Sequence, residues 1–372
     1  MPSLARHDAH PPGDEGSSTL LNENQSGVSG VTRRTALVTG ASLSSLAFLH
    51  GSTSSASPDA TEGQNTSPNA LLSSQITMPL IAYSFYKTSP EQAPRGLALA
   101  LRAGVRHFDM ASSYSNLDAI APLFKAYWKN KAVWKYEEET DELIQKLDET
   151  RIAGDGKKKR KKGRRQDLFL TYKLSNEEQS TDPQSIRSIV KNLLSQLDTQ
   201  YIDLVCIHSP LTGSELRLST YKTLLQLKHE GLIHTVGVCN YGLCHLKQIS
   251  LNNLPLPSVN QLEISPFNTH APIVQYCQEN GVKVSCAAWS RLSSNDGPVE
   301  QWAQLGEIAK EKGVTKAQIL VRWALQKGFG CAPRSGTGSK LEVRWIFSCD
   351  FCSVSKSILN KLFLVCVENC NS

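Results

Sequence analysis

Seven short apolar segments of the sequence each end in a residue whose side chain can take part in chemistry. In chain order these residues are Asp109, Lys173, His208, Asn240, Gln261, Trp289 and Arg334. Taken singly, each has a structural explanation, because an aspartate can cap a helix, a lysine can extend to solvent and a histidine can be satisfied in a core. Polar side chains are costly to bury, however, and here they are confined to the ends of the segments. Together they indicate a single site.

The segments that carry these residues have the length and composition of β-strands. With one further segment before them, they read MPLIAYSFY, VRHFD, DLFLTYK, YIDLVCIH, HTVGVCN, PSVNQLE, VKVSCAAW and GFGCAP. Longer amphipathic stretches separate them, such as DPQSIRSIVKNLLSQL, whose apolar residues fall on one helical face. Alternating strands and helices predict a parallel sheet with crossover helices. Eight strands in about 260 residues predict a (β/α)8 barrel, in which the strand ends meet at the face where active sites lie.

The motifs around these residues are more specific than the strand pattern. They are GVRHFDMASSY, LFLTYKLS, LLSQLDTQYIDLVCIHSP, GLIHTVGVCNYG, VNQLEISPF, AAWSRL and APRSGTGSK, in that order. In order, spacing and residue type the chain resembles the aldo-keto reductase family from about Met78 to Lys340, with an interruption between Lys125 and Arg165. The resemblance implies an NADP-dependent oxidoreductase that reduces aldehydes or ketones to alcohols with NADPH. A small-molecule carbonyl compound is then the expected partner, and we expect a monomer with no nucleic-acid partner and no membrane span.

The resemblance implies a catalytic set of Asp109, Tyr114, Lys173 and His208. Hydride addition to a carbonyl leaves an alkoxide that needs a proton, and a phenol with an ordinary pKa of about 10 is a reluctant donor. A neighbouring ammonium favours the phenolate, so Lys173 is expected to make Tyr114 a stronger acid. Asp109 would hold Lys173 by pairing with it. His208 would hydrogen-bond the carbonyl and orient it.

The resemblance also implies a cofactor site and no metal. Its expected residues are Cys239, Asn240, Gln261, Trp289, Ser290, Leu292, Arg334 and Ser335. The two amides would bind the nicotinamide carboxamide, with Cys239 beside them where the family has serine, and Trp289 would lie against the ring. Ser290 and Leu292 would present backbone to the pyrophosphate. Arg334, with Ser335 beside it, stands where a cation meets the adenosine 2′-phosphate, which favours NADPH because a guanidinium matches a phosphate dianion.

Some residues depart from the family pattern near this site. The first strand contains Ala82, Ser84 and Phe85 where relatives have smaller or hydroxylated residues, and Met110 follows the catalytic aspartate. We expect the three first-strand side chains to crowd the nicotinamide pocket, and both departures to weaken cofactor binding. The alternative function is therefore a non-catalytic, NADP-binding regulatory or degenerate barrel.

Residues 1–77 differ in character from the rest of the chain and are expected to be a disordered or targeting extension. Arg33-Arg34 precedes an apolar run that ends in the small residues 54–56, which is the order of a twin-arginine export signal. The run also contains VTGAS, but Ser44 and Leu46 stand where a phosphate-binding loop needs glycine, so a Rossmann unit is excluded. The expected location is cytoplasmic or organellar, and the plastid lumen is the destination if the signal is used.

A charged insertion and an atypical tail complete the expected organisation of the barrel at 78–340. The insertion at about 126–166 ends in the basic run KKKRKKGRR, which accounts for most of the net charge of +6 and is expected to be a solvated loop. A nucleic-acid patch is the alternative, although no aromatic residues interleave with the run for stacking. The tail at 341–372 is rich in cysteine and lacks the family's final helix, which leaves open whether the barrel is complete after its eighth strand. A zinc module is the alternative for the tail.

Overall fold

The fold is described from a computed structural model of the chain. The structure describes residues 69–72, 76–102, 104–129, 163–287, 289 and 299–333. All of them belong to one compact unit, Glu62–Ser372.

The described residues contain a sheet of eight parallel strands, which follow one another around the sheet in chain order. The strands are β3 (Tyr83–Ser84), β4 (His107–Ala111), β5 (Phe169–Leu174), β6 (Ile202–Ile207), β7 (Ile233–Cys239), β8 (Val259–Leu262), β9 (Lys283–Cys286) and β10 (Gly330–Cys331). The first and last strands also meet, because Ile81 forms a parallel bridge with Cys331. The Ala82 N–H donates to the Cys331 oxygen at 2.8 Å, and the Cys331 N–H donates to the Leu80 oxygen at 2.7 Å. The predicted (β/α)8 barrel is confirmed, and its ring of strands is closed.

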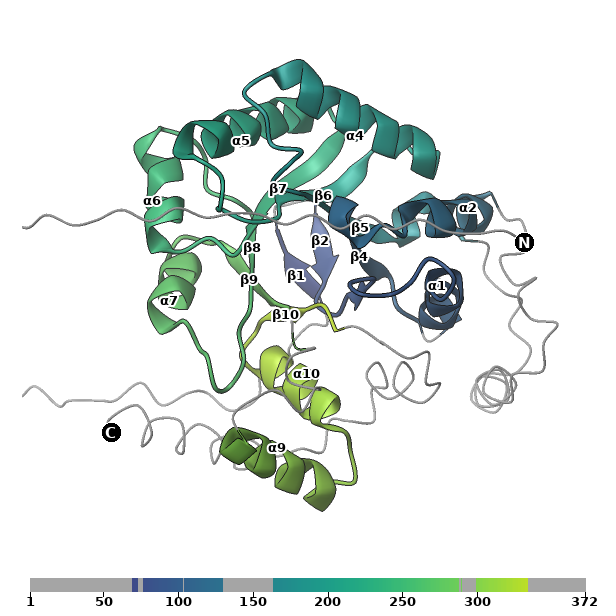
Figure 1. Cartoon of the computed structure of the whole chain (residues 1–372), viewed down its shortest axis with the longest axis vertical. Coiled ribbons are helices and arrows are strands. Elements are labelled where there is room, and N and C mark those ends of the chain that lie inside the picture. The colour runs from purple at the N-terminus through teal and green to yellow at the C-terminus, as the bar shows by residue number, and fades with distance from the viewer. Residues whose placement is uncertain are drawn as a thin grey trace, which may run out of the picture. The chain divides into compact units, whose positions relative to one another are not determined.

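Helices follow the strands and surround the sheet (Figure 1). They are α1 (Ala93–Arg102), α2 (Leu117–Trp128), α4 (Pro183–Leu197), α5 (Ser214–His229), α6 (Leu243–Leu251), α7 (Ala271–Glu279), α9 (Val299–Glu311) and α10 (Lys316–Gln326). Helix α4 shows why these segments are helical. Asp182 caps it by accepting from the N–H groups of Gln184 and Ser185, Pro183 fits its first turn, and Asp198 ends it in the left-handed conformation at φ 52°. The apolar face predicted for this segment is the buried face.

Strand alternation divides the core into two layers. Outward-facing residues such as Phe108, Leu170 and Val205 pack with the helices in the larger cluster. Inward-facing residues such as Phe169, Leu204 and Cys206 form a smaller cluster inside the ring. Since successive side chains of a strand point to opposite faces, each strand contributes to both layers.

A hairpin covers the amino-terminal ends of the barrel strands. Strand β1 (Asn69–Leu71) pairs antiparallel with β2 (Thr77–Pro79), and Met78 is buried against Phe169, the first residue of β5. The Pro79 oxygen lies 2.8 Å from His107 Nδ1, so this nitrogen donates and Nε2 accepts from the Thr171 hydroxyl, also at 2.8 Å. The segment MPLIAYSFY, predicted as one strand, is therefore divided between the hairpin and β3. The hairpin begins at Asn69, inside the extension predicted for residues 1–77.

The ends of the insertion are more ordered than the sequence predicts. Helix α2 continues to Trp128, and Arg165 packs over the Tyr201 ring at 4.2 Å while its Nη2 contacts Asp203 Oδ2 at 2.7 Å. Residues 126–128 and 163–166, predicted as insertion, thus belong to the barrel. The basic run up to Lys162, the tail at 341–372 and Arg33-Arg34 lie outside the described residues, and the predictions for them stay predictions.

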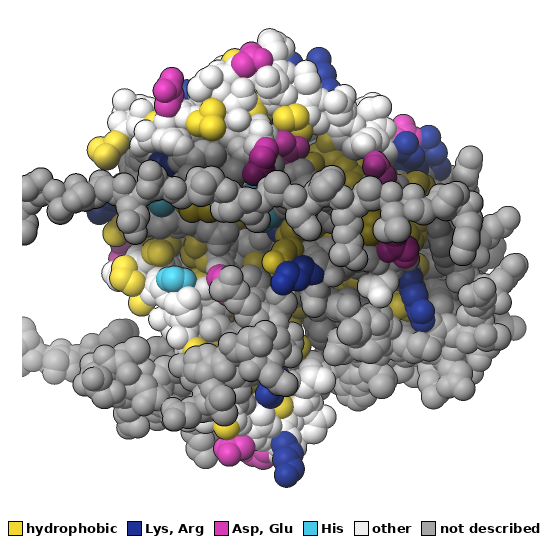
Figure 2. Space-filling model, in the orientation of Figure 1, with side chains coloured by type: hydrophobic (Ala, Val, Ile, Leu, Met, Phe, Trp, Pro, Cys, Tyr) yellow, Lys and Arg dark blue, Asp and Glu magenta, His cyan; other side chains and the backbone are white. Residues whose placement is uncertain are grey.

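On the face seen in Figure 2, the charged side chains that are coloured are scattered and of both signs. Within the described part of the chain, no helix is long and apolar enough to cross a membrane. The same residues contain no group of three or more His, Cys, Asp or Glu side chains placed to hold a metal ion.

Candidate active site

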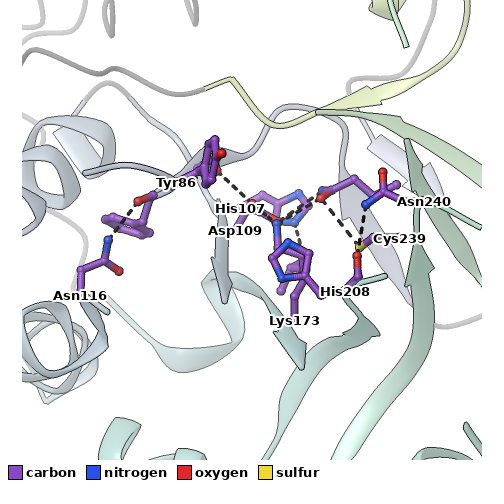
Figure 3. Close-up of polar contacts among 12 residues, drawn as sticks. Tyr86, His107, Asp109, Asn116, Lys173, His208, Cys239 and Asn240 are labelled. Carbon is purple, nitrogen blue, oxygen red and sulfur yellow. Dashed lines mark hydrogen bonds and ion pairs between the residues drawn. The ribbon is translucent and has the colours of Figure 1, made fainter. Parts of the chain in front are cut away.

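A buried ion pair lies inside the carboxyl-terminal half of the barrel. Lys173 Nζ contacts Asp109 Oδ2 at 2.6 Å, and both side chains are almost wholly shielded from solvent. Lys173 Nζ also donates to Gln261 Oε1 at 3.1 Å, and the Gln261 amide donates to Asp109 Oδ1 at 3.3 Å. These residues come from β5, β4 and β8, so the pair is held from both sides of the ring. Figure 3 shows the pair beside His208, Cys239 and Asn240.

Tyr114 and His208 lie next to this pair. Tyr114 ends a short 3-10 helix, Ser112–Tyr114, directly after β4, and His208 follows β6. Lys173 Nζ is 5.0 Å from the centre of the Tyr114 ring, and the Tyr114 and His208 rings are 6.0 Å apart in an edge-to-face arrangement. The structure therefore brings together all four residues of the predicted catalytic set.

Each member of the ion pair keeps the other charged, because their attraction outweighs the effect of burial on both pKa values. Burial acts to raise the pKa of Asp109, but Lys173 outweighs it through its charge and hydrogen bond, and the pKa is lowered. Burial likewise acts to lower the pKa of Lys173, and Asp109 outweighs it, so that pKa is raised. Lys173 is therefore a permanent ammonium and Asp109 a permanent carboxylate at neutral pH.

Tyr114 and His208 are both neutral in this environment. Burial raises the pKa of Tyr114 to about 12, although Lys173 opposes the shift. The expected net increase in the acidity of Tyr114 is thus wrong for the chain alone, because loss of hydration exceeds the effect of the ammonium. Burial, followed by the charge of Lys173, lowers the pKa of His208 to about 4. A neutral imidazole can donate one hydrogen bond without carrying a charge.

The predicted nicotinamide-binding residues lie along the adjacent rim. Asn240 follows β7, is exposed, and has a left-handed backbone at φ 61°. Its side-chain amide donates to the His208 oxygen at 3.2 Å. Cys239, buried at the end of β7, faces Gln261 in the strand register, with 3.9 Å between Cys239 Sγ and Gln261 Oε1. The Trp289 indole is buried and donates to the Ile264 oxygen at 2.7 Å, which fixes the plane of its ring.

The remaining predicted cofactor residues cannot be placed. Ser290, Leu292, Arg334 and Ser335 lie outside the described residues. The sites proposed for the pyrophosphate and the 2′-phosphate therefore rest on the sequence.

Two of the residues that depart from the family pattern do not point into the pocket. Phe85 is fully buried between Tyr83 and Phe108, with its ring stacked on Phe108 at 6.2 Å between centroids. Met110 belongs to the same helix-facing layer. The expectation of crowding is wrong for Phe85, because strand alternation turns Phe85 and Met110 away from the interior. Ser84 does face inward, and its hydroxyl donates to Asp109 Oδ2 at 3.0 Å.

Two residues missed by the sequence analysis support Tyr114. The Tyr86 ring packs against the Tyr114 ring at 5.4 Å. Asn116, almost fully buried, donates to the oxygens of Phe85 and Thr88 at 2.9 and 3.0 Å, and so fixes the loop that carries Tyr86. Tyr86 ends the first predicted segment, MPLIAYSFY, so the strand-end pattern could have marked it, whereas Asn116 ends no such segment.

Comparison with known proteins identifies the class to which this barrel and its site belong. The family model described as "Aldo/keto reductase family" matches residues 82–347, beyond the Lys340 at which the motif resemblance ends. An uncharacterized oxidoreductase of Schizosaccharomyces pombe is 30% identical over 269 residues, covering 72% of this chain and 82% of the relative. The methylglyoxal reductase DkgA of Escherichia coli K12 is 26% identical over 264 residues, covering 71% of this chain and 82% of the relative.

Solved structures agree on the fold. A Brucella melitensis aldo/keto reductase has a TM-score of 0.61 at 23% identity, covering 80% of this chain and 99% of the other. A Bombyx mori aldo-keto reductase, solved in complex with NADP, has a TM-score of 0.62 at 21% identity, covering 81% and 93%. The chain belongs to the aldo/keto reductase family. It is an oxidoreductase of that family.

Proposed function

We propose that the protein reduces aldehydes or ketones to alcohols with NADPH, with Tyr114 as the proton donor. The observation that carries the proposal is the clustering of Tyr114, His208 and the buried Asp109–Lys173 pair at one end of the barrel. A protein that only bound a dinucleotide would have no use for a proton donor beside a buried ammonium.

The side chains divide the work of proton transfer. The Tyr114 hydroxyl gives its proton to the carbonyl oxygen as negative charge develops on it. Lys173 stabilises the phenolate that remains, because its ammonium lies 5.0 Å from the centre of the ring. Asp109 holds that ammonium in place at 2.6 Å. His208, neutral because burial lowers its pKa to about 4, donates a hydrogen bond that orients the substrate carbonyl.

The described rim fits a nicotinamide. Asn240 and Gln261 present two carboxamide side chains from the ends of neighbouring strands, and the planar Trp289 indole is fixed by its bond to the Ile264 oxygen. Two amides can pair with a third amide, and an indole can lie flat against an aromatic ring. NADPH, when bound there, supplies the hydride. The preference for NADPH over NADH rests on Arg334 and on the neighbour solved with NADP.

The proposed substrate is a small carbonyl compound. Support comes from relatives that are named as methylglyoxal reductases, because methylglyoxal is a small carbonyl compound. The expectation of a monomer stays a prediction.

The test is the replacement Tyr114→Phe. Loss of the hydroxyl should lower the reduction rate by at least about 10²-fold and leave NADPH affinity nearly unchanged, because general-acid assistance acts only in the transition state. NADPH absorbance with a panel of aldehydes would give the rate, and NADPH fluorescence would give the affinity. Tyr276→Phe, on the half-buried face of α7, is the matched control.

Two outcomes would contradict the proposal. Near-normal turnover in Tyr114→Phe would remove this residue from the reaction. A wild-type chain that binds NADPH but reduces none of the aldehydes would favour the non-catalytic barrel.

A further inference from the structure

The first barrel strand has a hydroxyl directed at the catalytic carboxylate. Ser84 and Asp109 are register partners in β3 and β4, and Ser84 is only 3% exposed. Ser84 Oγ lies 3.0 Å from Asp109 Oδ2, the same oxygen that Lys173 Nζ contacts at 2.6 Å. Since the Gln261 amide donates to Oδ1, the carboxylate receives three donors from three strands.

The direction of this hydroxyl is set by a second bond. The Tyr86 N–H donates to Ser84 Oγ at 3.3 Å, so one lone pair of that oxygen is occupied. A carboxylate oxygen can only accept, and the Ser84 hydrogen must therefore point at Asp109. Tyr86 is also the residue whose ring packs against Tyr114 at 5.4 Å. Ser84 thus contacts Asp109, which pairs with Lys173, and Tyr86, whose ring packs against Tyr114.

We propose that Ser84 is a positioning residue of the acid–base site. Its hydroxyl takes up part of the negative charge of Asp109, so Asp109 neutralises the Lys173 ammonium less. The ammonium then stabilises the Tyr114 phenolate more. This rests on the proposed function. A hydrogen bond to a charged group is stronger than a neutral one, because it spreads part of the charge onto the donor. Without the hydroxyl, the full negative charge of Asp109 would act on its neighbours. It would neutralise more of the Lys173 ammonium and disfavour the Tyr114 phenolate.

The other titratable groups around Asp109 and Tyr114 leave this role to Ser84. They are His107 on β4, Lys173 on β5, Cys206 on β6, His208 after β6, Cys239 on β7 and Tyr86 after β3. His107 is already bonded to Pro79 and Thr171, and its pKa is lowered by burial. The pKa of Cys206 is raised by its contact with Cys239 and by burial, so its thiol stays neutral. Lys173 is then the sole cation beside Asp109 among the described residues.

The test compares Ser84→Ala, Ser84→Thr and Ser84→Gly in single-turnover measurements. In the reduction of propanal with NADPH, Ser84→Ala should slow hydride transfer by about threefold to tenfold, because Tyr114 becomes a weaker acid. In the oxidation of propanol with NADP⁺, which requires the phenolate, the rise of the rate with pH should move to higher pH. NADPH affinity should change by less than about twofold. Ser84→Thr retains the hydroxyl and should restore both the rate and the pH profile.

A second readout does not depend on activity. Removing a donor from Asp109 should raise the pKa of this carboxyl in the folded chain toward its unfolded value, so the stability that Ser84→Ala loses relative to wild type should be full above about pH 5 and should shrink as the pH falls below about 4. Urea unfolding between about pH 3 and pH 6 would follow the loss. Ser285→Ala is the matched control, because Ser285 is another buried serine of the sheet, on β9, and is not bonded to Asp109.

The outcomes separate this inference from the proposed function. If wild type is active and Tyr114→Phe is not, but Ser84→Ala matches wild type in rate, pH profile and acid stability, Ser84 has no positioning role. A Ser84→Gly chain faster than wild type would show that Ser84 only crowds the pocket. A wild-type chain with no turnover would overturn the proposed function, and this inference with it.

Discussion

The amide of Gln261 has two roles to reconcile at the level of single residues. The sequence assigns it to the nicotinamide carboxamide, whereas in the structure it bonds Lys173 Nζ at 3.1 Å and Asp109 Oδ1 at 3.3 Å. The Gln261 oxygen also accepts from Cys239 Sγ at 3.9 Å, so both of its lone pairs are used and one amide hydrogen remains for a ligand. Asn240, exposed at the rim, has no such commitment to the ion pair. Recognition of a carboxamide would therefore begin at Asn240.

His208 should not titrate in the physiological range. Burial and the Lys173 charge lower its pKa to about 4, so the neutral form prevails above that pH. We expect kcat/KM for aldehyde reduction to show no inflection from His208 between about pH 5 and pH 8. Ring-proton NMR of the free chain, with His208→Asn to assign the signal, would measure the pKa directly. A His208 signal that titrates near pH 6.5 would contradict the structure.

The sequence predicted the residues at strand ends but not the contacts among them. Asp109, Lys173 and His208 were predictable because a parallel barrel brings its strand ends together, whatever the details of packing. The bond from Ser84 to Asp109 was not, because it depends on the register of β3 against β4. The sequence analysis also missed that the pKa of Tyr114 is raised. The sequence identifies the Lys173 ammonium but not how deeply the phenol is buried.

At the level of elements, the hairpin shows where the strand pattern is insufficient. MPLIAYSFY has the composition of a single strand, yet the chain leaves β2 at Pro79 and begins β3 at Tyr83. The reason is tertiary, because the Pro79 oxygen accepts from His107 and Met78 packs into the barrel interior. Neither partner is adjacent in sequence. The other strands were predicted well because each is bounded by polar or helical residues.

The hairpin should contribute to stability but not to chemistry. Leu72 packs against the interior cluster, whereas the neighbouring Leu71 is 59% exposed. Leu72→Asp should lower the free energy of unfolding by about 2 kcal/mol, because it places a charge against apolar surface. Leu71→Asp is the matched control and should change little. Both variants should keep the wild-type kcat, since the hairpin covers the end of the barrel opposite Tyr114. Equal losses from the two variants would mean that the hairpin does not pack on the barrel.

For the molecule as a whole, the buried ion pair is both a catalytic group and a stability requirement. Replacing Asp109 by Asn would leave the Lys173 ammonium buried without its counter-ion. We expect a loss of about 3–5 kcal/mol in urea unfolding at pH 7, as is usual when one member of a buried pair is removed. Glu230→Gln is the control, because it breaks the surface pair with Arg187 and should cost little.

The pH dependence of that difference follows from the sign of the shift. The pKa of Asp109 is lowered in the folded chain, so its contribution is complete above the ordinary value of about 3.9. It is lost as the pH falls from there through the folded pKa. The stability gap between wild type and Asp109→Asn should therefore be constant between about pH 5 and pH 8 and narrow below about pH 4. A gap that already narrows near neutrality would show that the pair is solvated.

The seam that closes the barrel lies between two strands of only two residues each, β3 and β10, and its bridge pairs Cys331 with Ile81, which precedes β3. These partners stand at opposite ends of the barrel sequence, so the seam cannot form until nearly all of that sequence has left the ribosome. Pairing across such a separation is slow, because loop closure must precede any reward from the contact. A nascent chain that ends before Cys331 has two unpaired strand edges, which are the surfaces through which incomplete sheets aggregate. We therefore expect chaperone demand during synthesis to depend on the seam rather than on the residues of the candidate active site.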